Sequence, residues 1–73
     1  MTMGQKIKEL RKAKKLSQKE LAGKIGTTQS AINNWEQDKF YPSLFSCLVM
    51  ADFFKVTLDE LCCRNFKVGD DNG

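Results

Sequence analysis

The sequence contains no histidine, a single proline and no apolar run long enough to cross a membrane. An uncharged stretch over residues 41–51 includes that proline and two serines, and it falls short of the roughly 18 apolar residues that a membrane span needs. The amino-terminal residues are charged and amphipathic and do not form the apolar core of a secretory signal. We therefore expect a soluble protein of the cytoplasm without a membrane partner.

The three cysteines do not have the spacing of a zinc site. Cys47, Cys62 and Cys63 form no C-x-x-C motif, and no histidine is available to complete a ligand set. We expect neither a metal nor any other cofactor. Reduced thiols, with Cys47 as a small core residue, are typical of a cytosolic protein. A redox role for the adjacent Cys62 and Cys63 stays open as an alternative.

Catalytic motifs are missing as well. The chain has no glycine-rich phosphate loop and no pair of carboxylates that a motif would set opposite one another. We therefore expect neither an enzyme nor a small-molecule site. The 73 residues, 41% of them hydrophobic, suffice for one domain with a modest core.

The charge is distributed unevenly along the chain. Residues 1–25 hold eight Lys or Arg against two Glu, whereas residues 26–73 hold four against seven acidic residues. The first part therefore carries +6 and the second −3, which together make the net charge of +3. A basic half suits a phosphate-rich partner, although a lysine-rich solvated helix face explains the charge equally well.

Five helices are predicted from apolar spacing and from capping signals. The first covers residues 5–15, with Ile7 and Leu10 on its apolar face. Ser17 and Glu20 form a capping box that begins the second helix, because each side chain can accept a hydrogen bond from the other residue's backbone amide.

Gly26 separates the second helix from the third, since glycine readily takes the left-handed conformation that ends a helix. Thr27 or Thr28 caps the third helix, which is predicted from about residue 28 to residue 38. Its apolar residues, Trp35 among them, face the core and leave an outer face that is polar and uncharged.

Ser43, directly after the only proline, caps a fourth helix. The residues predicted to lie on its inner face are Leu44, Cys47, Leu48, Ala51 and Phe54. Thr57 and Glu60 form a capping box for a short fifth helix. We therefore predict one all-α domain over residues 1–66 and a flexible tail over residues 67–73.

The second and third helices together have the features of a major-groove reader. The major groove admits one helix, and a glutamine or asparagine can bond an adenine edge through two hydrogen bonds. These two helices belong to a longer series of motifs along the chain. The motifs are Ile7-x-x-Leu10-Arg11, Leu16-Ser17-Gln18-x-Glu20-Leu21-Ala22, Ile25-Gly26, Ile32-x-x-Trp35-Glu36, Pro42 and Ala51-x-x-Phe54-x-Val56-x-Leu58-x-x-Leu61. In these residues the sequence resembles the helix-turn-helix domain of the Cro and lambda-repressor type, a five-helix family of phage and bacterial transcriptional regulators.

The resemblance implies roles for ten polar residues. Four are candidates for reading base edges: Gln29, Ser30, Asn34 and Asn33. Four more are candidates for contacts with the DNA backbone: Gln18, Thr28, Lys39 and Tyr41. Gln29, at the amino end of the recognition helix, is the strongest candidate for a base contact. Asn33 is explained equally well as part of an ordinary polar helix face. Arg11 and Glu36 match an ion pair between the first and third helices, which would make them part of the scaffold. Asp38 departs from the family's pattern, in which glycine commonly ends the third helix.

By this resemblance the protein is expected to bind double-stranded DNA sequence-specifically as a transcriptional regulator of the repressor class. One recognition helix reads only a few base pairs, so a homodimer on an inverted-repeat operator is expected. We expect the dimer contact around the fifth helix and residues 62–68, where Phe66 and Val68 lie beyond the predicted core, unless those two fold back onto the fourth helix. A helix-turn-helix used as a protein-interaction module, such as an antitoxin or adaptor, is the alternative.

Overall fold

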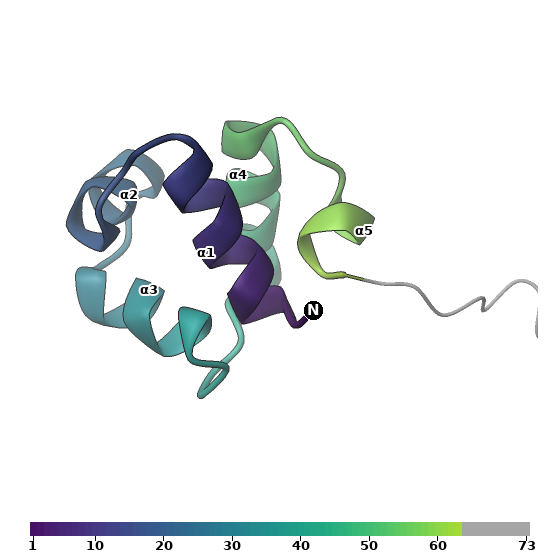
Figure 1. Ribbon diagram of the computed structural model, residues 1–73, viewed down its shortest axis with the longest axis horizontal. Helices are drawn as coiled ribbons and strands as arrows, with labels where there is room; N and C mark the ends of the chain where they lie inside the picture. The colour runs from purple at the N-terminus through teal and green to yellow at the C-terminus, as the bar shows by residue number, and fades with distance from the viewer. Residues whose placement is uncertain (64–73) are drawn as a thin grey trace, which may run out of the picture.

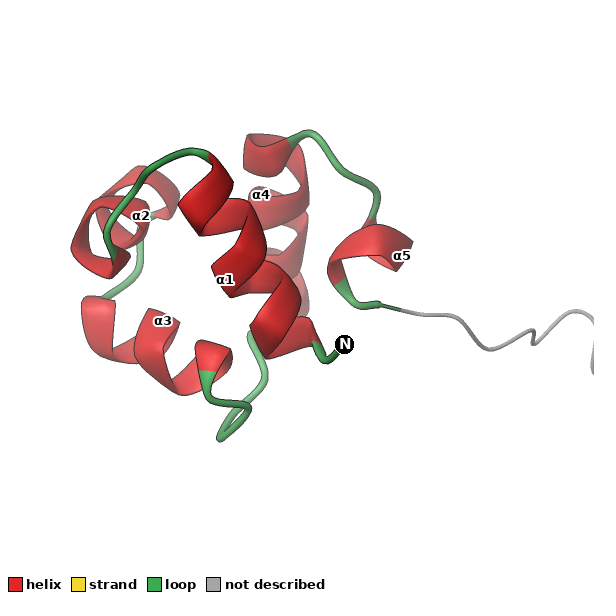
Figure 2. Ribbon diagram, viewed as in Figure 1, coloured by secondary structure: helices red, strands yellow, loops and turns green. Residues whose placement is uncertain are grey.

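The structure is a computed structural model, and it describes residues 1–63 of the chain. This part contains five helices and no strand, as the sequence predicts (Figures 1 and 2). The helices are α1 (Met3–Ala13), α2 (Gln18–Ile25), α3 (Gln29–Glu36), α4 (Leu44–Phe54) and α5 (Leu58–Leu61). None of them is long and apolar enough to span a bilayer. The predicted domain boundary at residue 66 and the tail over residues 67–73 lie outside the described residues.

Every helix of the described part begins with a serine or threonine whose side chain accepts a hydrogen bond from a first-turn amide. The five capping residues are Thr2, Ser17, Thr28, Ser43 and Thr57. The capping boxes predicted for α2 and α5 are both present. In the first of these, the hydrogen bond from the Ser17 amide lowers the pKa of the exposed Glu20 carboxyl.

Three predicted helix boundaries are wrong. The first helix begins at Met3 and not at residue 5, because Thr2 and Gln5 form a third capping box that apolar spacing does not reveal. It ends at Ala13, and Lys15 takes a left-handed φ of 60°. The third helix ends at Glu36, two residues before its predicted end, and the next turn continues through residue 38.

The core lies where the helices converge and is formed by ten buried apolar residues: Ile7, Leu21, Ala22, Ile32, Trp35, Cys47, Met50, Ala51, Phe54 and Leu61. Trp35 is 8% exposed, which confirms its predicted place in the core. The prediction for α4 is partly wrong, because Leu44 and Leu48 are exposed and Met50 is fully buried. This helix is apolar on nearly all sides, so spacing alone could not identify its buried face.

The amino end of α1 packs closely against the carboxyl end of α3. Asp38, with a left-handed φ of 59°, accepts hydrogen bonds from the Gly4 amide at 3.1 Å and from the Thr2 hydroxyl at 2.7 Å. A Cβ atom at Gly4 would collide with the backbone oxygens of Trp35 and Glu36. Aspartate therefore tolerates the backbone conformation that glycine commonly takes here and also uses its carboxylate to join the two helices.

Candidate nucleic-acid interface

The helices α2 and α3 form a helix-turn-helix around Gly26, whose φ of 76° ends α2 and lets the chain turn into α3. Ala22 on α2 and Ile32 on α3 are buried in the core that the two helices share. The small Ala22 side chain allows a close approach of the helices. As a result, α3 is held at the surface with one face directed outward (Figure 1).

The outward face of α3 is made of amide and hydroxyl groups. Gln29 and Ser30 are exposed in its first turn, and Asn33 and Asn34 are half-buried one turn later. These four side chains carry no charge and offer both donors and acceptors. The structure thus brings all four predicted base-reading residues to one helix.

The hydroxyl of Thr28 caps this helix by accepting a hydrogen bond from the Ala31 amide at 3.1 Å. A hydroxyl that accepts one hydrogen bond can still donate its own hydrogen to a phosphate oxygen. Thr28 is exposed and directly precedes Gln29. Its capping role and its predicted contact with the DNA backbone are therefore compatible.

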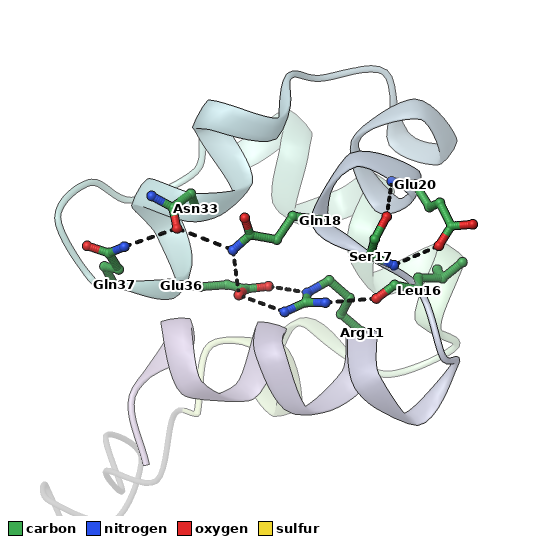
Figure 3. A network of polar contacts seen from close by, with 8 residues as sticks. All are labelled: Arg11, Leu16, Ser17, Gln18, Glu20, Asn33, Glu36 and Gln37. Atoms are coloured by element: carbon green, nitrogen blue, oxygen red, sulfur yellow. Dashed lines mark hydrogen bonds and ion pairs between the residues drawn. The ribbon is translucent and has the colours of Figure 1, made fainter.

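Arg11 and Glu36 form a buried ion pair between α1 and α3 (Figure 3). The arginine Nε lies 2.6 Å from Glu36 Oε2, and its Nη2 donates to Oε1 at 3.1 Å. Nη1 donates to the Leu16 carbonyl oxygen at 2.8 Å. The two side chains are 10% and 4% exposed, so they join the helices and are withdrawn from the surface.

This ion pair continues into a chain of amides that leads to the outward face of α3 (Figure 3). The Gln18 Nε2 donates to Glu36 Oε1 at 3.0 Å and to Asn33 Oδ1 at 3.3 Å. Asn33 Oδ1 also accepts from Gln37 Nε2 at 3.0 Å. Because its oxygen is used twice, the Asn33 amide is held in one orientation and has its Nδ2 available for another partner.

The connection was not predicted, since Gln18 and Asn33 are fifteen residues apart and no motif joins them. This connection also affects the expected role of Gln18. A phosphate oxygen accepts hydrogen bonds and needs a donor, but the side-chain donor of Gln18 is directed inward. The first backbone amides of α2 have no partner within the helix and supply donors at the same place.

Lys39 and Tyr41 lie in the loop after α3, and both are exposed. The Lys39 amide donates to the Asn34 carbonyl oxygen at 2.9 Å, which ties the loop to the end of the helix. The lysine side chain therefore starts from a fixed position beside the outward face of α3.

The three cysteines of the chain are free thiols. Burial raises the pKa of the Cys47 thiol, and the neighbouring Cys62 thiol adds to this effect. Cys63 is directed elsewhere, with its sulfur 3.5 Å from the Thr2 carbonyl oxygen. The two adjacent cysteines thus have different neighbours.

Comparison with known proteins agrees with this geometry. A family model described as helix-turn-helix matches residues 7–61. The chain is 39% identical over 61 residues to the HTH-type transcriptional activator BcrR of Enterococcus faecalis, covering 84% of this chain and 30% of that protein. It is 46% identical over 44 residues to the immunity repressor protein of Bacillus phage phi105, covering 60% of this chain and 31% of that protein. The chain thus spans about a third of the length of these two relatives.

Among solved structures, the P22 c2 repressor in complex with a synthetic operator is similar to the chain, with a TM-score of 0.80 and 28% sequence identity. The match covers 84% of this chain and 92% of the repressor chain. The five helices therefore have the same arrangement in both proteins.

Proposed function

The chain belongs to the helix-turn-helix family, and from this premise we propose that it is a transcriptional regulator of the repressor class that binds double-stranded DNA sequence-specifically. In this proposal residues 1–66 form the DNA-binding domain, residues 67–73 form a tail, and the protein acts in the cytoplasm. The observation that carries the proposal is the polar, uncharged face of α3 at the surface of the five-helix fold. Such a face can match the donors and acceptors of base edges.

The base-reading residues differ in what they can recognise. Gln29 is exposed at the amino end of α3, and its amide can bond both the N6 and N7 positions of adenine. Asn34 and Ser30 flank it with further donors and acceptors. Asn33 keeps a donor but not an acceptor, so it suits an acceptor such as guanine O6 and cannot make the paired contact with adenine.

Contacts with phosphates set the position of α3 in the groove without reading sequence. Thr28, Lys39 and Tyr41 are exposed at the two ends of α3. Gln18 contributes through its backbone amide at the start of α2, since its side-chain nitrogen is bonded to Glu36 and Asn33. Lysines of α1 and α2 add to the attraction between the protein and DNA.

The proposed assembly on DNA is a homodimer on an inverted-repeat operator. One α3 helix contacts only a few base pairs, which is too little to specify one operator in a genome. Two copies related by a two-fold axis would place their recognition helices about 34 Å apart, one turn of DNA.

Selection of bound sequences from random duplex DNA tests this function. We expect the wild-type chain to enrich an inverted repeat, and Gln29→Ala to change the preferred base at one position of each half-site, with discrimination falling by about 1–3 kcal/mol. Lys39→Ala is the contrasting variant, because losing a phosphate contact should weaken all duplexes similarly. If Gln29→Ala weakened every duplex to the same extent, the base-reading role would be refuted.

A protein-interaction module, such as an antitoxin or adaptor, is the second candidate function. The observation in its favour is the exposure of large apolar side chains next to α3, including Phe40 and Phe45. If the wild-type chain enriched no duplex at any salt concentration, this second function would be preferred.

A further inference from the structure

Five large apolar side chains are exposed within one short segment of the chain. They are Phe40 at 63% exposure, Tyr41 at 77%, Leu44 at 69%, Phe45 at 73% and Leu48 at 48%. We call these five residues the apolar patch. They belong to the loop after α3 and to the first half of α4 (Figure 1).

The patch makes α4 apolar on two opposite sides. Tyr41, Leu44, Phe45 and Leu48 follow the spacing of one helical face, while the core face carries Cys47, Met50, Ala51 and Phe54. Asp52 is the only charged residue of the helix. A helix with this composition is normally covered on both sides, and within residues 1–63 the side of the patch is exposed.

The size of the patch is close to that of a protein interface. An aromatic side chain has about 200 Å² of surface, so three that are 63–77% exposed and two leucines present on the order of 500 Å². A typical interface uses about 800 Å² on each partner, and weak complexes use less. Together with polar residues around it, the patch is therefore large enough for two copies to associate weakly in solution and more tightly when both are bound to DNA.

The absence of charge from the apolar patch suits contact with a second copy of the same chain. A two-fold contact brings the same surface of both copies together, so any charge on it would meet an equal charge. Residues 40–51 contain no charged side chain, and Lys39 and Asp52 lie at the two ends of this segment. The patch can therefore contact itself without repulsion.

The position of the patch suits two-fold binding to DNA. Phe40 follows the end of α3 by four residues, and the Lys39 amide is bonded to the Asn34 carbonyl oxygen of that helix. A contact between two patches thus brings the carboxyl ends of both α3 helices toward the two-fold axis. The hydroxyl of Tyr41 stays able to reach a phosphate while its ring is covered.

We propose that a second copy of this chain covers the apolar patch, so that the dimer contact is formed by the loop after α3 and the first half of α4. This inference rests on the proposed function, and it replaces the surface expected from the sequence, around α5 and residues 62–68. Residues 64–68 of that surface lie outside the described residues.

The test compares the full chain with Phe45→Glu. Phe45 is exposed, so the substitution should leave the fold and the melting temperature nearly unchanged. Ala13→Glu is the matched control, because it adds the same charge at an exposed position at the carboxyl end of α1. Sedimentation and concentration-dependent amide NMR shifts report association of the free chain. Titration of a selected full site and of a single half-site reports binding to DNA.

We expect amide signals of residues 40–48 to shift with concentration in the wild type and in Ala13→Glu but not in Phe45→Glu. On the full site, Phe45→Glu should bind its second copy at least about tenfold more weakly than Ala13→Glu, with half-site affinities that agree within about twofold. Unchanged association of Phe45→Glu, or one copy per full site in the wild type, would overturn the proposal.

A third variant, Phe66→Asp, tests whether Phe66 contributes to association or covers the apolar patch. If Phe66 of the same chain covered the patch, Phe66→Asp would increase association, and if Phe66 formed the dimer contact, Phe66→Asp would abolish it; either result overturns the proposal. Association equal to that of the wild type supports it. Absence of binding to any duplex would refute the proposed function alone, because association of the free chain tests the patch independently.

Discussion

At the scale of single residues, a buried ion pair supports the surface that is proposed to read DNA. Glu36 accepts from Arg11 on one side and from Gln18 on the other, and Gln18 in turn bonds Asn33. These bonds connect α1, α2 and α3. The orientation of an amide on the outer face of α3 thus depends on a charge pair inside the molecule.

Removing either member of this pair should destabilise the protein strongly. Arg11→Ala and Glu36→Ala should each lower the free energy of unfolding by about 3–5 kcal/mol, because the remaining charge stays buried without its partner. The double variant should be much less destabilised than the sum of the two, as measured by urea denaturation.

The exposed pair of Lys6 and Glu9, whose charged atoms lie 3.3 Å apart, is the control for this cycle. Its coupling should be about 0–1 kcal/mol. Simple additivity of the Arg11 and Glu36 substitutions would show that the buried pair does not act as a unit.

At the scale of the element, the two glycines of the helix-turn-helix have opposite roles. Gly23 lies inside α2, and apart from the backbone of its own helix a Cβ atom there would have no neighbour within 4 Å. Gly26 ends the same helix with a left-handed φ of 76°. One glycine is thus free to change, whereas the other determines the direction of α3.

Alanine at these two positions should change stability in opposite directions. Gly23→Ala should raise the free energy of unfolding by about 1 kcal/mol, because alanine favours the helix. Gly26→Ala should lower it by about 1–2 kcal/mol, because its Cβ crowds the following carbonyl oxygen in the left-handed conformation. Thermal or urea unfolding measures both, and equal effects would contradict this assignment.

At the scale of the whole molecule, charge is separated along the chain, with +6 on residues 1–25 and −3 on residues 26–73. Residues 1–25 form α1 and α2, which pack against α3 on the scaffold side. Lys39 is the first basic residue after the recognition helix and supplies a positive charge at its other end. Basic residues thus precede and follow the proposed DNA-binding helix along the chain.

Binding to DNA should accordingly weaken as salt rises, and Lys39→Ala should reduce the slope of log affinity against log salt by about one for each half-site. Lys55→Asn is the control, since it removes the same charge at the opposite end of α4 and asparagine tolerates the left-handed φ of 58° found there. Titrations of one selected duplex at several salt concentrations measure the slopes. Equal slopes for the two variants would exclude a phosphate contact by Lys39.

The five helices, the turn at Gly26 and the burial of Trp35 were predictable from the amino-acid sequence. These features depend on local chemistry, because a capping box joins residues three apart and apolar spacing identifies a buried face when the opposite face is polar. The polar outer face of α3 was predictable for the same reason.

Contacts between groups far apart in the sequence depend on how the helices pack. The hydrogen bond between Gln18 and Asn33, and the use of Asp38 to hold the amino end of α1, join residues that no local pattern relates. The apolar patch was also hidden, because α4 is apolar on opposite sides and spacing could not tell its core face from its exposed one. The packing of α4 in the core determines which side of it is left for a partner.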